Sequence, residues 1–191
     1  MRVPTMRCHR DCAFEHATLR RSRRSFIAGF ACVAVLPSAS FAEVRNSGSS
    51  EDERFMRIAL EEARQGDFPF GAVIVRDGMV VARGRNLGRT NNDPTAHGEM
   101  VAIRRCLADH GAAALRGSTL YTSGEPCAMC MGAILWSRVG RLVFAASVAQ
   151  LATRIDQIML SSADVAAKAT FVPISITGGV LADEAMALFV K

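Results

Sequence analysis

The sequence has little cysteine and, beyond its first 42 residues, no excess of either charge. Only Cys106, Cys127 and Cys130 follow residue 42, and if the last two bind a metal, no pair is left for a disulfide. Residues 43–191 carry 16 basic and 16 acidic side chains, so the formal net charge of +5 comes from residues 1–42. These absences argue against a disulfide scaffold and remove the general electrostatic reason to bind nucleic acid.

The sequence also lacks an apolar run long enough to span a bilayer comfortably. The run over residues 26–36 is about a dozen residues long, follows a cluster of arginines and precedes small residues that end at Ala42, which is typical of a secretory signal. The order Ser-Arg-Arg-Ser-Phe-Ile over residues 22–27 is typical of a twin-arginine signal. We therefore predict a signal peptide over residues 1–42 and a periplasmic mature protein without a permanent membrane span. The alternative is a true start near Met56 and a cytoplasmic protein.

After a polar linker over residues 43–50, the sequence predicts a single α/β domain over residues 51–191, without internal repeats. The expected elements are a helix over 50–65 opened by a capping box of Ser50 and Glu53, strands over 70–75 and 79–84, a helix over 97–110, a strand over 118–122, a helix over 127–137, a strand over 141–146, a mostly helical stretch over 147–168, a strand over 169–177 and a helix over 181–190. Alternating strands and helices favour a three-layer α/β/α sandwich around a five-stranded mixed sheet. The long, helical connection to the last strand favours a parallel crossover.

The pattern that carries most chemical information combines His97, Cys127 and Cys130. One imidazole and two thiolates suit a four-coordinate Zn²⁺ that keeps one position open for water. The spacing of three places both cysteines on one face of a helical turn, and Pro126 suits the start of that helix. A redox Cys-x-x-Cys pair is the alternative, but such a pair normally follows the first strand of its domain. This pair comes late and follows a His-x-Glu segment, which favours the metal.

Glu99 is the candidate for the proton transfers that hydrolysis at such a zinc requires. Zinc lowers the pKa of a bound water and so supplies hydroxide at ordinary pH. In a hydrolytic deamination, one nearby carboxylate can take the water's proton, protonate a ring nitrogen and assist the departure of ammonia. The alternative is that Glu99 only occupies a favourable place in the first turn of a helix.

Other candidate side chains have simpler structural interpretations. The amide of Asn86 could contact the edge of a base, or the residue could only shape a turn. Phe70 and Trp136 could stack on a base, but aromatic residues in apolar runs usually belong to the core. Cys106 is interpreted as a small buried residue.

The sequence resembles the cytidine deaminase superfamily over about residues 54–146. The family's first strand is similar to residues 69–75, and its two core blocks are similar to residues 86–99 and 120–134. These blocks include the His-x-Glu and Pro-Cys-x-x-Cys arrangement of zinc deaminases that act on nucleobases. The branch in question holds bacterial guanine deaminases, tRNA adenosine deaminases and fungal-type cytosine deaminases. Within it, Tyr121-Thr122-Ser123 and Trp136 look most similar to guanine deaminases.

This resemblance implies roles for seven residues. They are His97, Cys127 and Cys130 as zinc ligands, Glu99 as the catalytic proton shuttle, and Asn86, Gly98 and Asp156 as substrate contacts, the last near a carboxylate that guanine deaminases use to bind an amidine.

We therefore predict a zinc-dependent hydrolytic deaminase of a free nucleobase, with guanine as the best candidate, that releases ammonia and acts as a homodimer. Cytosine, a nucleoside and the adenosine of tRNA stay open as substrates. The neutral domain and the export signal argue against tRNA, as does the uncharged stretch over residues 145–150, where tRNA enzymes normally carry charges. Three nearby arginines, at 83, 85 and 89, are interpreted as a solvated face. The alternative from another class is a non-catalytic zinc-binding module, which would be expected to lack Glu99.

Overall fold

The computed structural model describes residues 44–45 and 48–189, so the predicted signal peptide over residues 1–42 lies outside the described residues. The elements, in chain order, are β1 (Val44–Arg45), α1 (Ser50–Arg64), β2 (Gly71–Arg76), β3 (Met79–Arg85), α2 (Gly98–His110), the 3₁₀ helix η1 (Ala112–Ala114), β4 (Thr119–Gly124), α3 (Ala128–Trp136), β5 (Arg141–Ala146), α4 (Val148–Leu151), α5 (Ser162–Ala167), β6 (Ser175–Thr177) and α6 (Ala182–Met186). Within the described part of the chain, no helix combines the length and the apolar character that crossing a bilayer requires.

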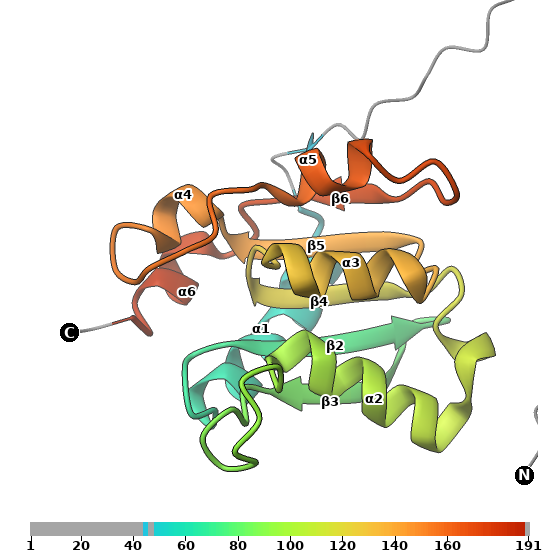
Figure 1. Cartoon of the computed structure of the whole chain (residues 1–191), viewed down its shortest axis with the longest axis horizontal. Helices are drawn as coiled ribbons and strands as arrows, with labels where there is room; N and C mark the ends of the chain where they lie inside the picture. The colour runs from blue at the N-terminus through green and yellow to red at the C-terminus, as the bar shows by residue number, and fades with distance from the viewer. Residues whose placement is uncertain (1–43, 46–47, 190–191) are drawn as a thin grey trace, which may run out of the picture. The chain divides into compact units, whose positions relative to one another are not determined.

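The strands form one mixed sheet in the order β1-β6-β5-β4-β2-β3 (Figure 1). β2 and β3 pair as an antiparallel hairpin whose turn places Asp77 and Gly78 at positive φ, as the right-handed twist of a hairpin favours. β4 lies antiparallel to β2 and parallel to β5, and β6 lies parallel to β5. The five predicted strands and the parallel crossover are therefore confirmed. β1 adds a sixth strand of two residues, parallel to β6 and within the predicted linker.

Two apolar clusters place helices on both faces of the sheet, which confirms the three layers. On one face, Ile103 of α2 and Ile134 of α3 are buried with Leu120 of the sheet. On the other face, Leu60 of α1 is buried with Val143 of the sheet. Figure 1 shows α2 and α3 side by side in front of the strands, with α1 behind them. Strand residues alternate between the two clusters, as the two-residue period of a strand requires.

The capping box of α1 lies one residue earlier than predicted. Ser49, not Ser50, accepts the hydrogen bond from the backbone of Asp52, and the Asp52 carboxylate accepts one from the backbone of Ser49. Glu53 instead faces solvent beside Arg57. The shift has a tertiary cause, because Asp52 also accepts hydrogen bonds from the sheet and is buried there.

The C-terminal third departs most from the prediction. Residues 147–168 contain only the short helices α4 and α5, joined by an irregular segment over residues 152–161. Ile158, Met159 and Leu160 are all exposed there, so the burial that would stabilise a continuous helix is absent. The last strand is limited to β6, since Pro173 cannot donate to a strand ladder. The final helix, α6, is likewise shorter than predicted.

Candidate metal centre and active site

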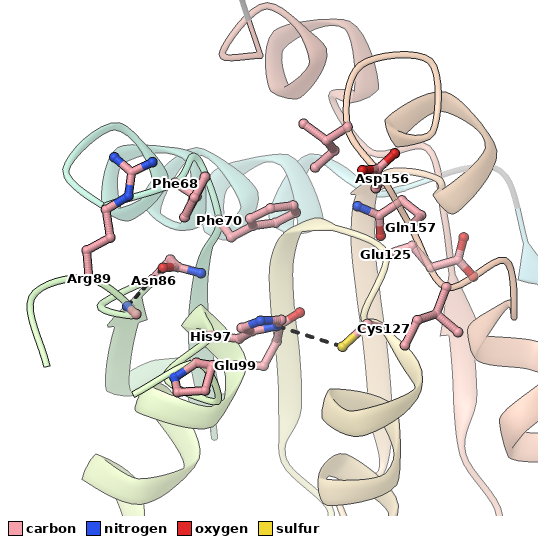
Figure 2. Close-up of a pocket in the computed structure, with 14 residues that line it drawn as sticks. Phe68, Phe70, Asn86, Arg89, His97, Glu99, Glu125, Cys127, Asp156 and Gln157 are labelled. Atoms are coloured by element: carbon pink, nitrogen blue, oxygen red, sulfur yellow. Dashed lines mark hydrogen bonds between the residues drawn. The ribbon is translucent and has the colours of Figure 1, made fainter. Parts of the chain in front are cut away.

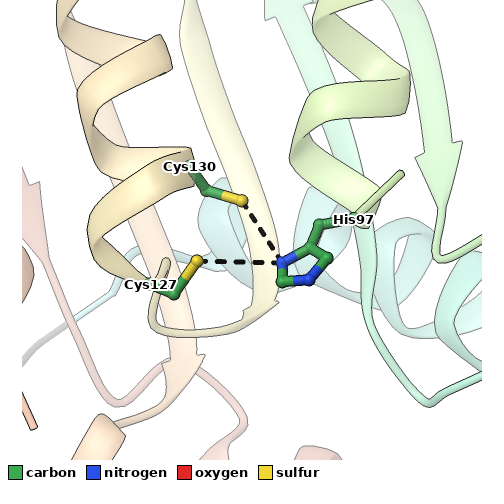
Figure 3. Close-up of side chains that lie close together, drawn as sticks. All are labelled: His97, Cys127 and Cys130. Atoms are coloured by element: carbon green, nitrogen blue, oxygen red, sulfur yellow. Dashed lines mark hydrogen bonds between the residues drawn. The ribbon is translucent and has the colours of Figure 1, made fainter. Parts of the chain in front are cut away.

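The three predicted zinc ligands converge from the starts of two helices. His97 is the N-cap residue of α2, and Cys127 is the N-cap residue of α3, with Cys130 in the first turn of α3. β4 ends at Gly124, close before Cys127 in the chain, so the end of this strand positions Cys127. Pro126 directly precedes Cys127, the N-cap residue of α3. Figure 3 shows both thiols pointing from α3 toward the imidazole.

The separations within this trio fit a tetrahedral zinc ion. The Nδ1 atom of His97 lies 3.7 Å from the Sγ atom of Cys127 and 3.6 Å from that of Cys130. The three ligand atoms all lie within 4.8 Å of one another. Zinc–sulfur bonds of about 2.3 Å and zinc–nitrogen bonds of about 2.0 Å at a tetrahedral angle place sulfur and nitrogen about 3.5 Å apart. The donor set and its spacing therefore fit zinc, with Nδ1 as the coordinating atom of His97.

The two thiols ionise very differently from each other, because they share a hydrogen bond. Hydrogen bonds from Cys130 and His97 hold the pKa of the Cys127 thiol at about 4, although burial opposes this. The hydrogen bond with Cys127 and burial raise the pKa of the Cys130 thiol, and repulsion from the nearby Cys127 thiolate raises it further. A divalent cation would remove that repulsion and allow both sulfurs to coordinate as thiolates.

Glu99 is buried in the first turn of α2, next to the trio. Only 3% of its surface is exposed, and the hydroxyl of Thr122 donates to its Oε1 atom at 3.4 Å. Burial raises the pKa of the Glu99 carboxyl above its ordinary value. A carboxyl group with a raised pKa can both accept and return a proton near neutral pH, which its chemistry in a hydrolytic site would require.

A cavity of about 470 Å³ opens next to His97, Glu99 and Cys127 (Figure 2). His97, Glu99 and Cys127 line its base, while Phe68 and Phe70 line one side. The loop from Asn86 to Pro94 and the segment over residues 155–158 supply the remaining walls. Its size lies within the range of about 300–1,000 Å³ typical of small-molecule sites.

Asn86 lies in this cavity with a defined orientation. Its Oδ1 atom accepts a hydrogen bond from the backbone N–H of Gly88 at 3.1 Å. That contact fixes which end of the amide is nitrogen, and Figure 2 shows the nitrogen directed into the cavity. Asn86 therefore shapes its own loop and also presents a donor to the cavity.

Asp156 and Gly98 are placed differently from each other. Asp156 lies in the opposite wall of the cavity, within the irregular segment after α4. Gly98 is buried under the cavity, where an added Cβ atom would lie 2.9 Å from the carbonyl oxygen of Phe70. Close contact between α2 and β2 is thus sufficient reason for a glycine at this position.

The two aromatic candidates lie in different places, and only Trp136 departs from the prediction. Phe70 lines the cavity and also packs edge-on against Phe189, with ring centroids 5.2 Å apart. Trp136 is neither in the core nor at the cavity: 75% of its surface is exposed, and it stacks on Phe171 with centroids 4.4 Å apart. The apolar run that suggested burial of Trp136 ends at that residue, where α3 leaves the sheet. Cys106 is buried, as predicted.

Sequence reasoning missed part of the cavity. Phe68, Arg89 and Gln157 line it, and the Arg89 guanidinium lies over the Phe68 ring at 4.5 Å. Glu125 also borders the cavity and binds two distant backbone groups. No spacing rule could have found these contacts, since the partners are far apart in the sequence. Only the proximity of Arg89 to Asn86 in one loop was a usable signal.

Comparison with known proteins places this arrangement in a family. The cytidine and deoxycytidylate deaminase zinc-binding region matches residues 49–146. Guanine deaminase of Bacillus subtilis is 48% identical over 95 residues, 49% of this chain and 61% of that protein. The tRNA-specific adenosine deaminase of Haemophilus influenzae is 47% identical over 104 residues, 52% of this chain and 60% of that protein. Each match spans less than two thirds of the relative.

Solved structures give the same result for the fold. A structure from a study of A-to-I editing by tRNA:A34 deaminases superposes with a TM-score of 0.63 at 34% identity, over 71% of this chain and 98% of that chain. Guanine deaminase from Nitrosomonas europaea superposes with a TM-score of 0.62 at 27% identity, over 78% of this chain and 87% of that chain. The two kinds of relative are about equally similar to this chain. The chain therefore belongs to the cytidine and deoxycytidylate deaminase family.

Proposed function

We propose that this protein is a zinc-dependent hydrolase that deaminates a free nucleobase, with guanine as the first candidate. The observation that carries the proposal is the buried carboxylate of Glu99 beside His97, Cys127 and Cys130, at the base of a cavity large enough for a base. A non-catalytic zinc module would have no use for a buried carboxylate at this place, since burial of such a group is costly.

The chain's own residues supply the proton transfers of this reaction. His97, Cys127 and Cys130 would hold zinc, which would acidify a water molecule and so supply the nucleophile. Glu99 accepts the proton of that water, delivers it to the ring nitrogen next to the attacked carbon, and then assists the amino group to leave as ammonia. The balance is one water consumed and one ammonia released, with a carbonyl in place of the amino group.

The walls of the cavity support a flat, polar substrate. Phe68 and Phe70 offer apolar surface for a ring, the amide nitrogen of Asn86 offers a donor, and the carboxylate of Asp156 offers an acceptor for an amidine. Guanine carries ring acceptors and an amidine together, and cytosine lacks the second ring that would span the cavity. Guanine is therefore tested before cytosine.

The adenosine of tRNA is the second candidate, because the tRNA-specific relatives are as similar to this chain as the guanine deaminase is. The balanced charges of residues 43–191 favour a small substrate over a polyanion. An ammonia-release assay with guanine, cytosine, adenine, their nucleosides, ammeline and tRNA separates these cases. Turnover of tRNA alone would replace the free base as substrate, and no turnover of any of them by zinc-loaded protein would contradict the proposal.

We further propose that the protein is exported after cleavage at Ala42 and works as a homodimer. The stacked pair of Trp136 and Phe171 supports the dimer, since both rings expose apolar surface that a monomer seldom leaves uncovered. Sedimentation of wild-type protein and of Trp136→Glu tests it, with a dimer and a monomer as the expected results. N-terminal sequencing of periplasmic protein tests the cleavage, and a first residue other than Glu43 would contradict the site.

A further inference from the structure

Glu125 has contacts that the proposed chemistry does not use. Its backbone continues the β4–β5 pairing, because its N–H donates to the carbonyl of Ala146 at 2.7 Å. Its side chain is directed elsewhere, and Figure 2 shows the carboxylate pointing away from His97. Glu125 is 7% exposed, so this carboxylate needs partners inside the protein.

Those partners are the first backbone N–H groups of two helices. The N–H of Val148, at the start of α4, donates to Oε2 at 2.9 Å, and the N–H of Ser162, at the start of α5, donates to Oε1 at 2.8 Å. Both donors are buried, so water cannot replace the carboxylate. Ser147 and Ser161 cap the third N–H of each helix, so Glu125 satisfies groups that the helices' own caps leave open.

These two donors stand at the ends of the segment that forms the far wall of the cavity. Residues 155–158 line the cavity between them. Within the described part of the chain, every hydrogen bond made by residues 152–160 stays inside residues 148–160. Ile155 packs against the apolar cluster under the sheet, and Ile158 is 61% exposed. The wall is therefore fixed to the rest of the molecule mainly at its two ends.

We propose that Glu125 is a positioning residue that holds both ends of residues 148–162 against the loop that carries Cys127. One carboxylate thereby fixes the distance between the zinc-binding loop and the wall that contains Asp156. The consequence for substrate affinity rests on the proposed function, whereas the coupling of the two helix starts does not.

The test replaces Glu125 with glutamine, which keeps the shape of the side chain but turns one oxygen into a donor facing an N–H. Amide hydrogen exchange by NMR on zinc-loaded protein should then show faster exchange at Val148 and Ser162 together, each by about tenfold or more, because a charge-assisted hydrogen bond is lost at buried groups. Zinc content should stay at the wild-type level. The KM for guanine should rise by about tenfold, with a smaller change in kcat, since the wall moves and the proton shuttle does not.

Two matched controls separate this coupling from ordinary loss of a cap. Ser161→Ala removes the α5 cap only, so exchange should accelerate at Asp164 in α5 and stay unchanged at Val148. Ser162→Ala removes a buried hydroxyl that has no hydrogen-bond partner among the described residues but keeps the N–H, so exchange should match wild type. If the glutamine variant fails to fold, Glu125→Asp, which keeps the charge but is too short to reach both donors, should accelerate exchange at one end.

Unchanged exchange at Val148 or at Ser162 in folded Glu125→Gln would overturn the proposal, as would unchanged exchange at both positions in folded Glu125→Asp. Loss of zinc together with unchanged exchange would overturn it as well. Faster exchange with an unchanged KM would overturn the link to the cavity wall. If wild-type protein does not turn over guanine, the proposed substrate is wrong, while the exchange data still decide whether Glu125 couples the two helices.

Discussion

Replacement of Asp52 by asparagine should destabilise the fold in a manner that depends on pH. Asp52 is 2% exposed, and Arg141 donates to both of its oxygens, at 2.7 and 2.9 Å. The Tyr121 hydroxyl donates to it at 3.0 Å, so the carboxylate ties α1 to β4 and β5. Burial alone would raise the pKa of Asp52, but the hydrogen bonds and charge of Arg141, with the Ser49 N–H, lower it from 3.8 to about 2.

The magnitude follows from that difference in pKa. A lowering from 3.8 to about 2 corresponds to at most about 2.4 kcal/mol of folding free energy at pH 7. Arg141 is 33% exposed and partly screened by solvent, so we expect about 2 kcal/mol. Because the folded pKa is the lower one, this contribution is fully present above about pH 5 and is lost as the pH falls through 3.8 toward 2. At pH 3, about half of it should remain.

Urea unfolding of wild type and Asp52→Asn at pH 7 and pH 3 measures the effect. The variant cannot titrate at this position, so the stability gap between the two proteins should narrow by about 1 kcal/mol on acidification. Both proteins carry the same zinc ligands, and protonation of those ligands cancels in the comparison. Glu53→Gln is the control, since Glu53 forms only an exposed pair with Arg57 and should change stability by about 0.5 kcal/mol or less. A gap that is equal at both pH values would refute the reasoning.

Three further predictions concern the site. Glu99→Gln should keep one zinc per chain but lower kcat by about 10²- to 10⁴-fold, because the proton shuttle is lost; a near wild-type rate of ammonia release would remove Glu99 from that role. Cys127→Ala should lose most bound zinc in a metal assay, since two protein ligands remain, and retention of stoichiometric zinc would mean that the ligand set is wrong. Gly98→Ala should lower stability by about 1–3 kcal/mol in urea unfolding, because its Cβ would meet the Phe70 carbonyl at 2.9 Å; wild-type stability would contradict that contact.

Local signals were sufficient for the elements that hold the metal. Pro126 just before the start of α3 and the Cys-x-x-Cys spacing each act within a few residues, and each was interpreted correctly from the sequence. The convergence of His97 with the cysteines also follows, once both lie at helix starts on one edge of the sheet. These features depend on backbone geometry that short segments determine by themselves.

The errors occur where a distant contact overrides a local pattern. The cap of α1 moved because Asp52 is bound by Arg141, 89 residues away. Trp136 was expected in the core because it ends an apolar run, but the helix ends there as well, and its ring stacks on Phe171 instead. Neither partner is marked by periodicity or by turn chemistry, so single-sequence reasoning had no signal for them.

The residues around the proposed substrate site also divide into those that local sequence determines and those that distant contacts determine. The His-x-Glu and Cys-x-x-Cys segments lie within the region shared with guanine and tRNA deaminases alike, so they determine the metal and the reaction without distinguishing substrates. We propose that the groups that distinguish substrates lie in the loop of Asn86 and in residues 155–158, which line the cavity. The first is fixed locally, by the N–H of Gly88, whereas the second depends on a carboxylate at residue 125 that reaches Val148 and Ser162. The sequence over residues 147–168 therefore has a helical pattern but forms two short helices. The two buried N–H groups can share the carboxylate of Glu125 only if the helix is interrupted between them.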